Sequence, residues 1–189
     1  AFCILVAMLV LYIIVRNNKE KAALIRSAQT DALTGVYNKE NTQNMIDEIL
    51  RKKDPDSFHG FLILDMDHFK EVNDVYGHAM GDKVLEMLGN FLKKQFREQD
   101  VIGRIGGDEF VILLYNIGSR QNMENRVKSL QEKIREIHMD GMEGHTFTLS
   151  AGIAFAPQDG DTFMELYQKA DLALYQVKRS GRNGYRIYK

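Results

Sequence analysis

Residues 101–115, VIGRIGGDEFVILLY, contain two short apolar runs separated by a glycine-rich turn. The runs at 101–105 and 110–115 have the length and composition of β-strands. The segment between them, residues 106–109, holds two glycines and two acids, which is typical of a tight hairpin. This stretch therefore predicts two antiparallel strands joined by a turn that carries two carboxylates.

A central strand is predicted upstream of this hairpin. Residues 61–64, FLIL, form a continuous apolar run, which suits a strand that is buried on both faces. Asp65 and Asp67 follow it directly, and open α/β sheets bind their ligands at the carboxyl ends of strands. Because side chains alternate along a strand, we expect the two acids on the same side of the sheet, with Met66 between them.

The rest of the chain alternates between helical and strand-like patterns. The order of helix, strand, helix, hairpin, helix, strand, helix and strand predicts an α/β fold with a split βαβ core. The supporting segments are helices at 41–53, near 69, and at 81–96, 119–138 and 162–178, with strands at 147–153 and 185–188.

The acids of the central strand and of the hairpin could form one site. If the hairpin pairs beside the central strand, Asp65, Asp67, Asp108 and Glu109 converge. Crowded carboxylates repel one another, and a bound divalent cation relieves the repulsion. Oxygen ligands suit Mg²⁺, and the two glycines of the turn would let a phosphate approach the backbone. The alternative is that these are two ordinary acidic turns that cap strands.

Composition excludes several other classes of protein. The chain has 189 residues, of which 44% are hydrophobic and 27% charged, with a net charge of -1. This is a globular composition without the basic excess of a nucleic-acid binder, so we expect no nucleic-acid partner. Cys3 is the only cysteine, which excludes internal disulfides and multi-cysteine metal sites. The histidines lack the HExxH spacing of a zinc protease.

The first residues differ from the rest of the chain. Residues 1–15 are all apolar, and four cations against one acid follow between residues 16 and 26. These features predict the C-terminal part of a transmembrane helix, followed by a helical stalk at 16–30 and a domain at 31–189. The expected location is the inner (cytoplasmic) membrane, with the domain facing the cytoplasm. A signal-peptide core or a buried helix are the alternatives.

Five segments occur in order within residues 31–189. They are DALTGVYN at 31–38, DMDHFKEVND at 65–74, YGHAMGD at 76–82, RIGGDEF at 104–110 and KRSGRN at 178–183. Through these segments the sequence resembles the GGDEF-domain diguanylate cyclases. The resemblance implies the GGDEF fold, which is a mixed sheet flanked by helices with a ferredoxin-like core of the nucleotidyl-cyclase and palm type.

The resemblance also implies a reaction. Members of the family join two GTP molecules into cyclic di-GMP and release two pyrophosphates, at a site formed between the two subunits of a homodimer. Asp65 and Asp108 would bind two Mg²⁺ (or Mn²⁺) ions together with the carbonyl of Met66. The ions would activate the ribose 3′-hydroxyl and neutralise the leaving pyrophosphate. Glu109 would act as a base or as a metal ligand, and the sequence does not choose between these roles.

The same resemblance assigns the substrate contacts. Asn73 and Asp82 would read guanine, because a buried carboxylate accepts hydrogen bonds from N1–H and the 2-amino group, which adenine lacks. Lys178 and Arg182 would hold the β- and γ-phosphates; their alternative role is as solvated charges near a helix end. The other residues with implied substrate contacts are Phe69, Lys70, His78, Gly106 and Gly107.

A second motif indicates product inhibition. Arg97 and Asp100 form an RxxD motif, and Arg97 lies nine residues before Gly106, which is the placement of the inhibitory product site in the family. Arg97 would bind a phosphate or the Hoogsteen edge of guanine, Asp100 would accept N–H groups, and Lys128 would be a secondary contact. The alternative is a surface salt bridge at a helix end.

The leading hypothesis is thus an active, membrane-tethered diguanylate cyclase with product inhibition. One competitor is a catalytically silent domain that binds GTP or cyclic di-GMP as a receptor. Another is a structural dimerisation module that uses the apolar stripe at 24–28, although this leaves the acidic and guanine-reading residues unexplained.

Overall fold

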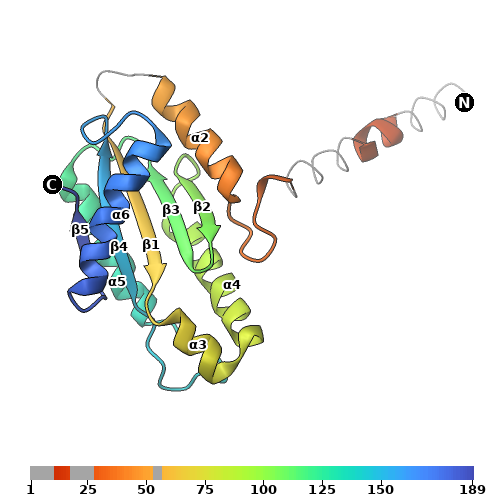
Figure 1. Ribbon diagram of the computed structural model, residues 1–189. Coiled ribbons are helices and arrows are strands. Elements are labelled where there is room, and N and C mark those ends of the chain that lie inside the picture. Colours follow the sequence, from red (N-terminus) through yellow and green to blue (C-terminus); the bar gives the residue numbers. More distant parts are fainter. Residues whose placement is uncertain (1–10, 18–27, 53–56) are drawn as a thin grey trace, which may run out of the picture.

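The computed structural model describes residues 11–17, 28–52 and 57–189. Helices and strands alternate through most of this chain, as Figure 1 shows. In chain order they are α2 (Lys39–Arg51), β1 (His59–Met66), α3 (Phe69–Tyr76), α4 (His78–Gln95), β2 (Val101–Gly106), β3 (Glu109–Leu114), α5 (Arg120–Arg135), β4 (Leu149–Ala156), α6 (Phe163–Arg179) and β5 (Tyr185–Ile187).

The strands form one mixed sheet in the order β2-β3-β1-β4-β5. β1 is antiparallel to β3 and β4, β2 is antiparallel to β3, and β5 is parallel to β4. β3 thus lies between β1 and β2, which are joined by α3 and α4. This arrangement confirms the predicted α/β fold with a split βαβ core.

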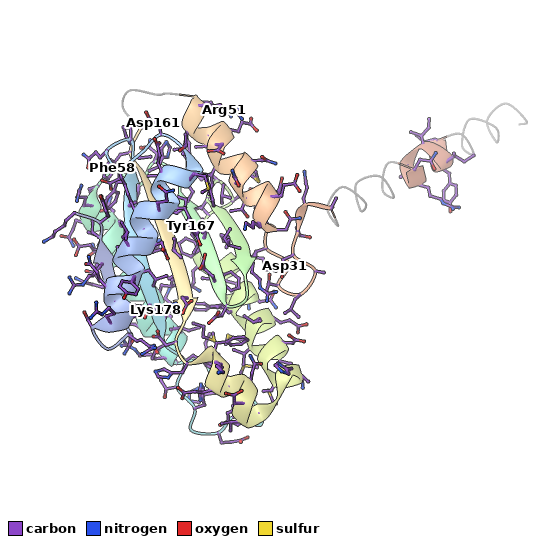
Figure 2. All side chains as sticks on the ribbon, in the orientation of Figure 1. Asp31, Arg51, Phe58, Asp161, Tyr167 and Lys178 are labelled. Atoms are coloured by element: carbon purple, nitrogen blue, oxygen red, sulfur yellow. The ribbon has the colours of Figure 1, made fainter. Side chains whose placement is uncertain are left out.

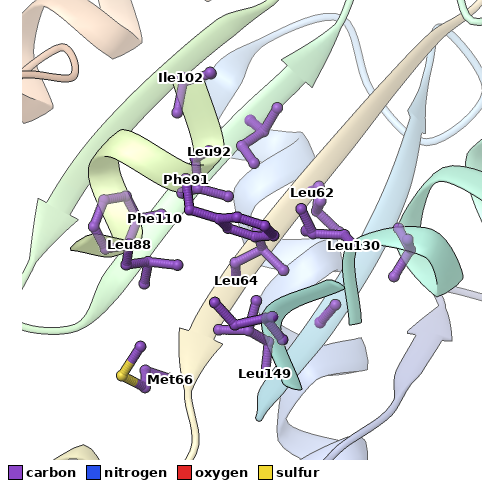
Figure 3. Packing of buried hydrophobic residues seen from close by; sticks show 14 of the residues in the cluster. Leu62, Leu64, Met66, Leu88, Phe91, Leu92, Ile102, Phe110, Leu130 and Leu149 are labelled. Atoms are coloured by element: carbon purple, nitrogen blue, oxygen red, sulfur yellow. The ribbon is translucent and has the colours of Figure 1, made fainter. Parts of the chain in front are cut away.

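Helices cover both faces of the sheet and enclose two apolar cores. In Figure 1, α6 and α2 lie over one face, while α4 and α5 lie over the other. Because side chains alternate, Leu62 and Leu64 of β1 pack into the core beneath α4 and α5, while Phe61 and Ile63 pack beneath α2 and α6. Figure 3 shows the first of these cores around Phe110. A central strand buried on both faces is what the FLIL run predicts.

One glycine allows α6 to lie close to the sheet. A Cβ atom at Gly152 of β4 would collide with the backbone oxygen of Ala170. The same atom would lie 2.6 Å from the backbone nitrogen of Leu174. A larger residue would therefore push α6 away from β4, and with it the two site residues that α6 carries, described below.

Most predicted boundaries lie within a few residues of the observed ones, with one difference that matters. The helix predicted at 81–96 begins earlier, at His78, because Gly77 (φ 82°) ends α3 and α4 starts directly after it. Gly81 and Asp82 therefore lie inside the first two turns of α4. The predicted hairpin is present, with only Gly107 and Asp108 between β2 and β3.

The prediction of a membrane location is contradicted. Residues 1–10 and 18–27, which hold most of the predicted span and stalk, lie outside the described residues. Across 11–17, 28–52 and 57–189, no helix is both long enough and apolar enough to span a bilayer. The membrane location is therefore not retained.

Candidate active site

Asp65 occupies the centre of the candidate site, at the carboxyl end of β1. It lies opposite Glu109 in the β1–β3 register and opposite Ser150 in the β1–β4 register. Its Oδ2 atom lies 2.7 Å from Nζ of Lys178, and the Asp65 side chain is only 13% exposed. Lys178 comes from the last turn of α6, labelled in Figure 2, so the fold joins residues that are 113 positions apart.

The surroundings of Asp65 disfavour its negative charge. Burial, together with the nearby charges of Asp108 and Glu109, raises the pKa of this carboxyl from 3.8 to about 6, against the opposing hydrogen bond and charge of Lys178. An acid in this state gains from a bound cation, because the cation restores the ionised form that burial and repulsion penalise. The charges of Asp108 and Glu109 thus act on Asp65, whereas Asp67 is not among the groups that affect its pKa.

The turn that carries Asp108 is tied to the start of the domain. Gly106 and Gly107 are exposed, and Gly107 has a φ of 50°, a left-handed conformation that glycine adopts without strain. Nε of Arg104 donates to the carbonyl of Gly107 at 2.8 Å. Nη1 of Arg104 also contacts Oδ1 of Asp31 at 3.1 Å. Arg104 thus connects the segment at 31–38 to the hairpin turn.

Asp31 is adapted to this contact. Burial alone would raise the pKa of Asp31, but hydrogen bonds from Thr34 and the ion pair with Arg104 outweigh it and lower the pKa below 3.8. Thr34 donates to Asp31 Oδ1 through its hydroxyl at 2.7 Å and its amide at 2.9 Å. Asp31 was singled out only as part of a motif, and sequence alone did not indicate its contact with Arg104.

Glu109 has a partner that the sequence analysis missed. The hydroxyl of Tyr167 donates to Oε1 of Glu109 at 2.6 Å. Tyr167 lies on α6 (Figure 2), and its ring stacks on Phe163 with centroids 5.7 Å apart. The hydrogen bond and burial raise the pKa of the phenol, so it remains a donor to the carboxylate. No motif marks Tyr167; the helical periodicity of 162–178 is the only sequence signal that involves it.

The carboxylate of the fourth predicted acid, Asp67, is satisfied by hydrogen bonds within the protein. Its carboxylate accepts hydrogen bonds from the hydroxyls of Thr148 and Ser150 and from the amide of Asn183, at 2.8, 2.6 and 3.0 Å. Asp67 is only 5% exposed. It therefore joins β1, β4 and the segment after α6, and does not join the repelling cluster around Asp65.

The donor set at this end fits a hard divalent cation that keeps water and substrate ligands. Within the described parts of the chain, no three His, Cys, Asp or Glu side chains form a metal-binding group. The oxygen ligands that the resemblance assigns here are the carboxylates of Asp65 and Asp108 and the carbonyl of Met66. An incomplete set of this kind suits Mg²⁺, which retains several waters and binds phosphate oxygens.

The predicted guanine-reading residues lie around the junction of α3 and α4. A Cβ atom at Gly81 would collide with Oδ1 of Asn73, so this glycine brings the two helices together at Asn73. Asp82 and His78 are exposed, and Asn73 is half-buried. The expectation of a buried Asp82 thus differs from the structure, in which a bound base would itself have to cover the carboxylate.

Further predicted substrate contacts come from two segments. Phe69 and Lys70 begin α3, with Phe69 half-buried and Lys70 exposed. Arg182 lies after α6 with a φ of 63°. The pKa of Glu71 is lowered first by a hydrogen bond with His68 and to a smaller degree by the charge of Arg182. Arg182 is therefore close enough to α3 to act on it electrostatically.

The RxxD residues form a rigid turn between α4 and β2. The buried carboxylate of Asp100 accepts the amide of Arg97 at 2.9 Å and the amide of Tyr115 at 3.0 Å. The side chain of Arg97 is exposed. Lys128 lies beside Glu124 and the ring of Tyr185, and is not brought to this turn. The cations of α5 that contact the end of α4 are Arg126 and Lys133, both through Gln95.

The chain matches the family described as "Diguanylate cyclase, GGDEF domain" over residues 28–184. It belongs to this GGDEF family. The match includes the hairpin turn, the acids of β1 and the residues after α6. Members of the family generally use a divalent metal, and the oxygen ligands of this GGDEF domain are compatible with one.

Individual relatives agree with this assignment. Diguanylate cyclase TpbB of Pseudomonas aeruginosa is 36% identical over 177 residues, covering 91% of this chain and 40% of TpbB. The chain thus spans less than half the length of that relative.

Solved structures show the same fold. The coiled coil and GGDEF domain of DgcB from Caulobacter crescentus, solved with c-di-GMP, has a TM-score of 0.81 at 23% identity and covers 93% of this chain and 92% of its own. A microbial GGDEF domain, solved for its interaction with cyclic di-GMP, is 31% identical with a TM-score of 0.72. That match covers 87% of this chain and 98% of the other.

Proposed function

We propose that this GGDEF domain is an active diguanylate cyclase that condenses two GTP molecules into cyclic di-GMP with release of two pyrophosphates. The observation that carries the proposal is the set of Asp65, Asp108 and Glu109 at adjacent strand ends, with the pKa of Asp65 raised to about 6. A silent domain has no need to retain three mutually repelling acids beside a lysine.

The residues at this end divide the work. Asp65, Asp108 and the carbonyl of Met66 would hold Mg²⁺, which when bound polarises the phosphates and acidifies the 3′-hydroxyl. Lys178 and Arg182 would bind the β- and γ-phosphates and stabilise the charge of the departing pyrophosphate. Glu109, which accepts a hydrogen bond from the hydroxyl of Tyr167, would accept the proton of the 3′-hydroxyl.

The base end would supply specificity. Asp82 would accept the N1–H and 2-amino donors of guanine, and Asn73 would bind the same base from α3. Adenine lacks both donors and would leave the covered carboxylate unpaired, so ATP would be rejected. Because Asp82 is exposed in the free protein, its carboxylate would discriminate between the bases only when a bound base shields it from water.

The proposed reaction needs two copies of the chain. Each 3′-oxygen forms a bond to the α-phosphorus of the other nucleotide, and each α–β phosphoanhydride bond breaks to release pyrophosphate. One chain carries one set of GTP-binding residues, so two chains must face each other in a homodimer. Positioning the two nucleotides in line is then the main catalytic contribution.

Product inhibition would use the turn at Arg97. Asp100 holds the turn through two backbone amides, which leaves the guanidinium of Arg97 free to bind a phosphate or guanine of cyclic di-GMP. Arg97→Ala is expected to raise the product concentration needed for half-inhibition at least tenfold while preserving initial turnover. Unchanged inhibition would reject this site, and Lys94→Ala, an exposed lysine on the same helix end, is the matched control.

The decisive experiment is incubation with GTP and Mg²⁺, followed by mass spectrometry for cyclic di-GMP. The 189-residue chain is tested alone and fused to a dimerising coiled coil, so that lack of a dimer cannot account for inactivity. Product from the fused protein, and none from its Asp65→Ala variant, is the expected result. Nucleotide binding without product would overturn the cyclase and favour the receptor.

A further inference from the structure

Asp67 is the one buried acid at this end of the sheet that the proposed chemistry does not use. Its three hydrogen-bond donors come from two different parts of the fold. Ser150 lies near the start of β4 and Thr148 directly precedes that strand, while the amide of Asn183 lies just beyond α6. The amide of Asp67 in turn donates to the carbonyl of Thr148 at 3.0 Å. Asp67 is thus anchored to β4 and reaches outward to the 181–184 turn.

The turn held by Asp67 is strained. Arg182 and Asn183 have φ values of 63° and 47°, a left-handed conformation that non-glycine residues seldom adopt, and they do so consecutively. Such a conformation persists only where surrounding contacts enforce it. Two contacts act on Asn183: Asp67 holds its amide, and Nη2 of Arg135 donates to its Oδ1 at 2.9 Å.

The strained turn carries a proposed phosphate ligand. Arg182 immediately precedes the amide that Asp67 accepts, and Lys178 lies one turn earlier at the end of α6. Because Arg182 is exposed, its own side-chain packing does not fix its direction, so the backbone of the turn must do so. The left-handed backbone therefore decides whether the guanidinium faces the substrate or the solvent.

We propose that Asp67 is a positioning residue for the triphosphate: through the amide of Asn183 it holds the turn that presents Arg182 to the β- and γ-phosphates. This inference rests on the proposed function, because it assumes that GTP binds at this end of the sheet. It assigns Asp67 no contact with substrate or metal, in contrast to Asp65 two residues earlier.

The test compares ligands that do and do not carry the outer phosphates. Calorimetry with Mg²⁺ measures the affinity for GMP and for a GTP analogue with a methylene bridge between the α- and β-phosphorus atoms. Asp67→Ala is expected to weaken binding of the GTP analogue at least tenfold and to leave the affinity for GMP unchanged. Equal affinity of Asp67→Ala and wild type for the analogue would overturn the proposal, as would an equal loss for GMP.

Two further variants separate positioning from other roles. In Asp67→Asn, an amide oxygen can still accept from Asn183 and Thr148, so analogue affinity should stay within about threefold of wild type. A metal ligand would instead lose as much in Asp67→Asn as in Asp67→Ala, and that result would contradict positioning. In an Arg182→Ala background, Asp67→Ala should cause little additional loss, because its effect passes through Arg182.

The control is Thr148→Val, which removes one donor to Asp67 and leaves the Asn183 amide in place; it should bind the analogue like wild type. If Asp67→Ala does not fold, hydrogen exchange of the Asn183 amide in the wild-type protein decides the question. An exposed residue whose amide is held by a buried carboxylate exchanges slowly, and fast exchange would overturn the proposal. Failure of wild type to bind the analogue would instead refute the proposed function and this inference together.

Discussion

The two ends of the proposed substrate site differ in how completely the protein assembles them without a ligand. At the triphosphate end, Asp65 pairs with Lys178 and Glu109 accepts a hydrogen bond from Tyr167. At the base end, the side chain of Asp82 is exposed and, within the described residues, has no hydrogen bond or ion pair. The side chains of the proposed triphosphate end are thus paired within the protein, whereas the proposed base end would gain its partners only from a bound nucleotide.

The difference follows from where each end lies. The proposed triphosphate end lies at the carboxyl end of the central strand β1, beneath α6. Its charged groups are therefore partly desolvated and must be paired. The base end lies on the outer turns of two helices, where water satisfies a carboxylate without cost. Pre-arranged charges favour the reaction, since they need no reorganisation when the transition state forms, whereas recognition of the base can use desolvation that occurs only on binding.

Replacing Asp65 should have the largest effect on activity, because it removes the central carboxylate of the proposed triphosphate end. Asp65→Asn is expected to lower cyclic di-GMP production by about 1000-fold or more, because it removes a charged metal ligand. Chromatography of the products measures this loss. The exposed acid Asp140 supplies the control Asp140→Asn, and comparable turnover in the two variants would remove Asp65 from the chemistry.

The same variant should make the protein more stable at high pH. The pKa of Asp65 is raised from 3.8 to about 6, so between these values the folded protein binds a proton that the unfolded chain does not. Stability therefore falls as pH rises through this window, and the penalty is fully present above it, on the order of 3 kcal/mol. Asp65→Asn should melt several degrees above wild type at pH 7.5 and show no such gain at pH 4. A gain of the same size at both pH values would contradict the raised pKa.

Replacing Asp82 tests the base end. Asp82→Ala is expected to lower kcat/KM for GTP about 100-fold and to weaken the preference over ATP, because two charge-assisted hydrogen bonds are lost. Its melting temperature should match that of wild type, since the exposed carboxylate makes no contact among the described residues. The matched control is Glu86→Ala on the same helix. Unaltered selectivity would show that guanine is read elsewhere.

Replacing Tyr167 tests the triphosphate end by removing a single hydroxyl group. Tyr167→Phe keeps the ring that stacks on Phe163 and removes the hydroxyl that orients Glu109, and we expect kcat to fall about tenfold with little change in KM. Tyr175→Phe, an exposed tyrosine of the same helix, should behave like wild type. An unchanged kcat in Tyr167→Phe would mean that Glu109 needs no orientation.

Replacing Arg104 should have the smallest effect, because it acts through the backbone. Arg104→Gln loses the ion pair with Asp31 and the hydrogen bond to Gly107, so we expect about threefold lower turnover and about 1 kcal/mol lower stability by urea unfolding. Because the pKa of Asp31 is lowered in the folded state, its contribution is present above pH 3.8 and is lost as pH falls below it. The exposed Arg51→Gln is the control, and identical stability in the two variants would contradict the proposed link.

The sequence predicted the fold well because the signals for it are local. The continuous apolar run FLIL predicts a buried strand, and the glycine-rich turn predicts a hairpin. The structure contains both, as β1 and as the paired strands β2 and β3. Local signals were weaker at the start of α4, where the break at Gly77 moves the helix start to His78. The membrane prediction rested on the apolar run at 1–15 and the basic residues that follow it, and the described part of the chain holds no helix long and apolar enough to span a bilayer.

The candidate site was predictable only where a motif marks it. Asp65, Asp108 and Lys178 stand in recognisable segments. The contact of Tyr167 with Glu109 and the hydrogen bonds to Asp67 instead depend on how α6 and β4 pack against β1. Lys128 was predicted as a secondary contact of the product site from the next helix, whereas the 100° step per residue of a helix turns Arg126 toward α4 and Lys128 toward Tyr185.

The sequence by itself determined the family, the order of the elements and the chemical types of the site residues, since these depend on residue identity and on neighbours within a few positions. Tertiary structure decided which acids repel one another and which are satisfied. Asp65 and Asp67 have the same side chain two positions apart, yet one lies beside Lys178, Asp108 and Glu109 and the other beside two hydroxyls and an amide. The physical reason is that a carboxylate's role is set by the groups within a few ångströms of it, and here those groups come from strands and a helix far away in the chain.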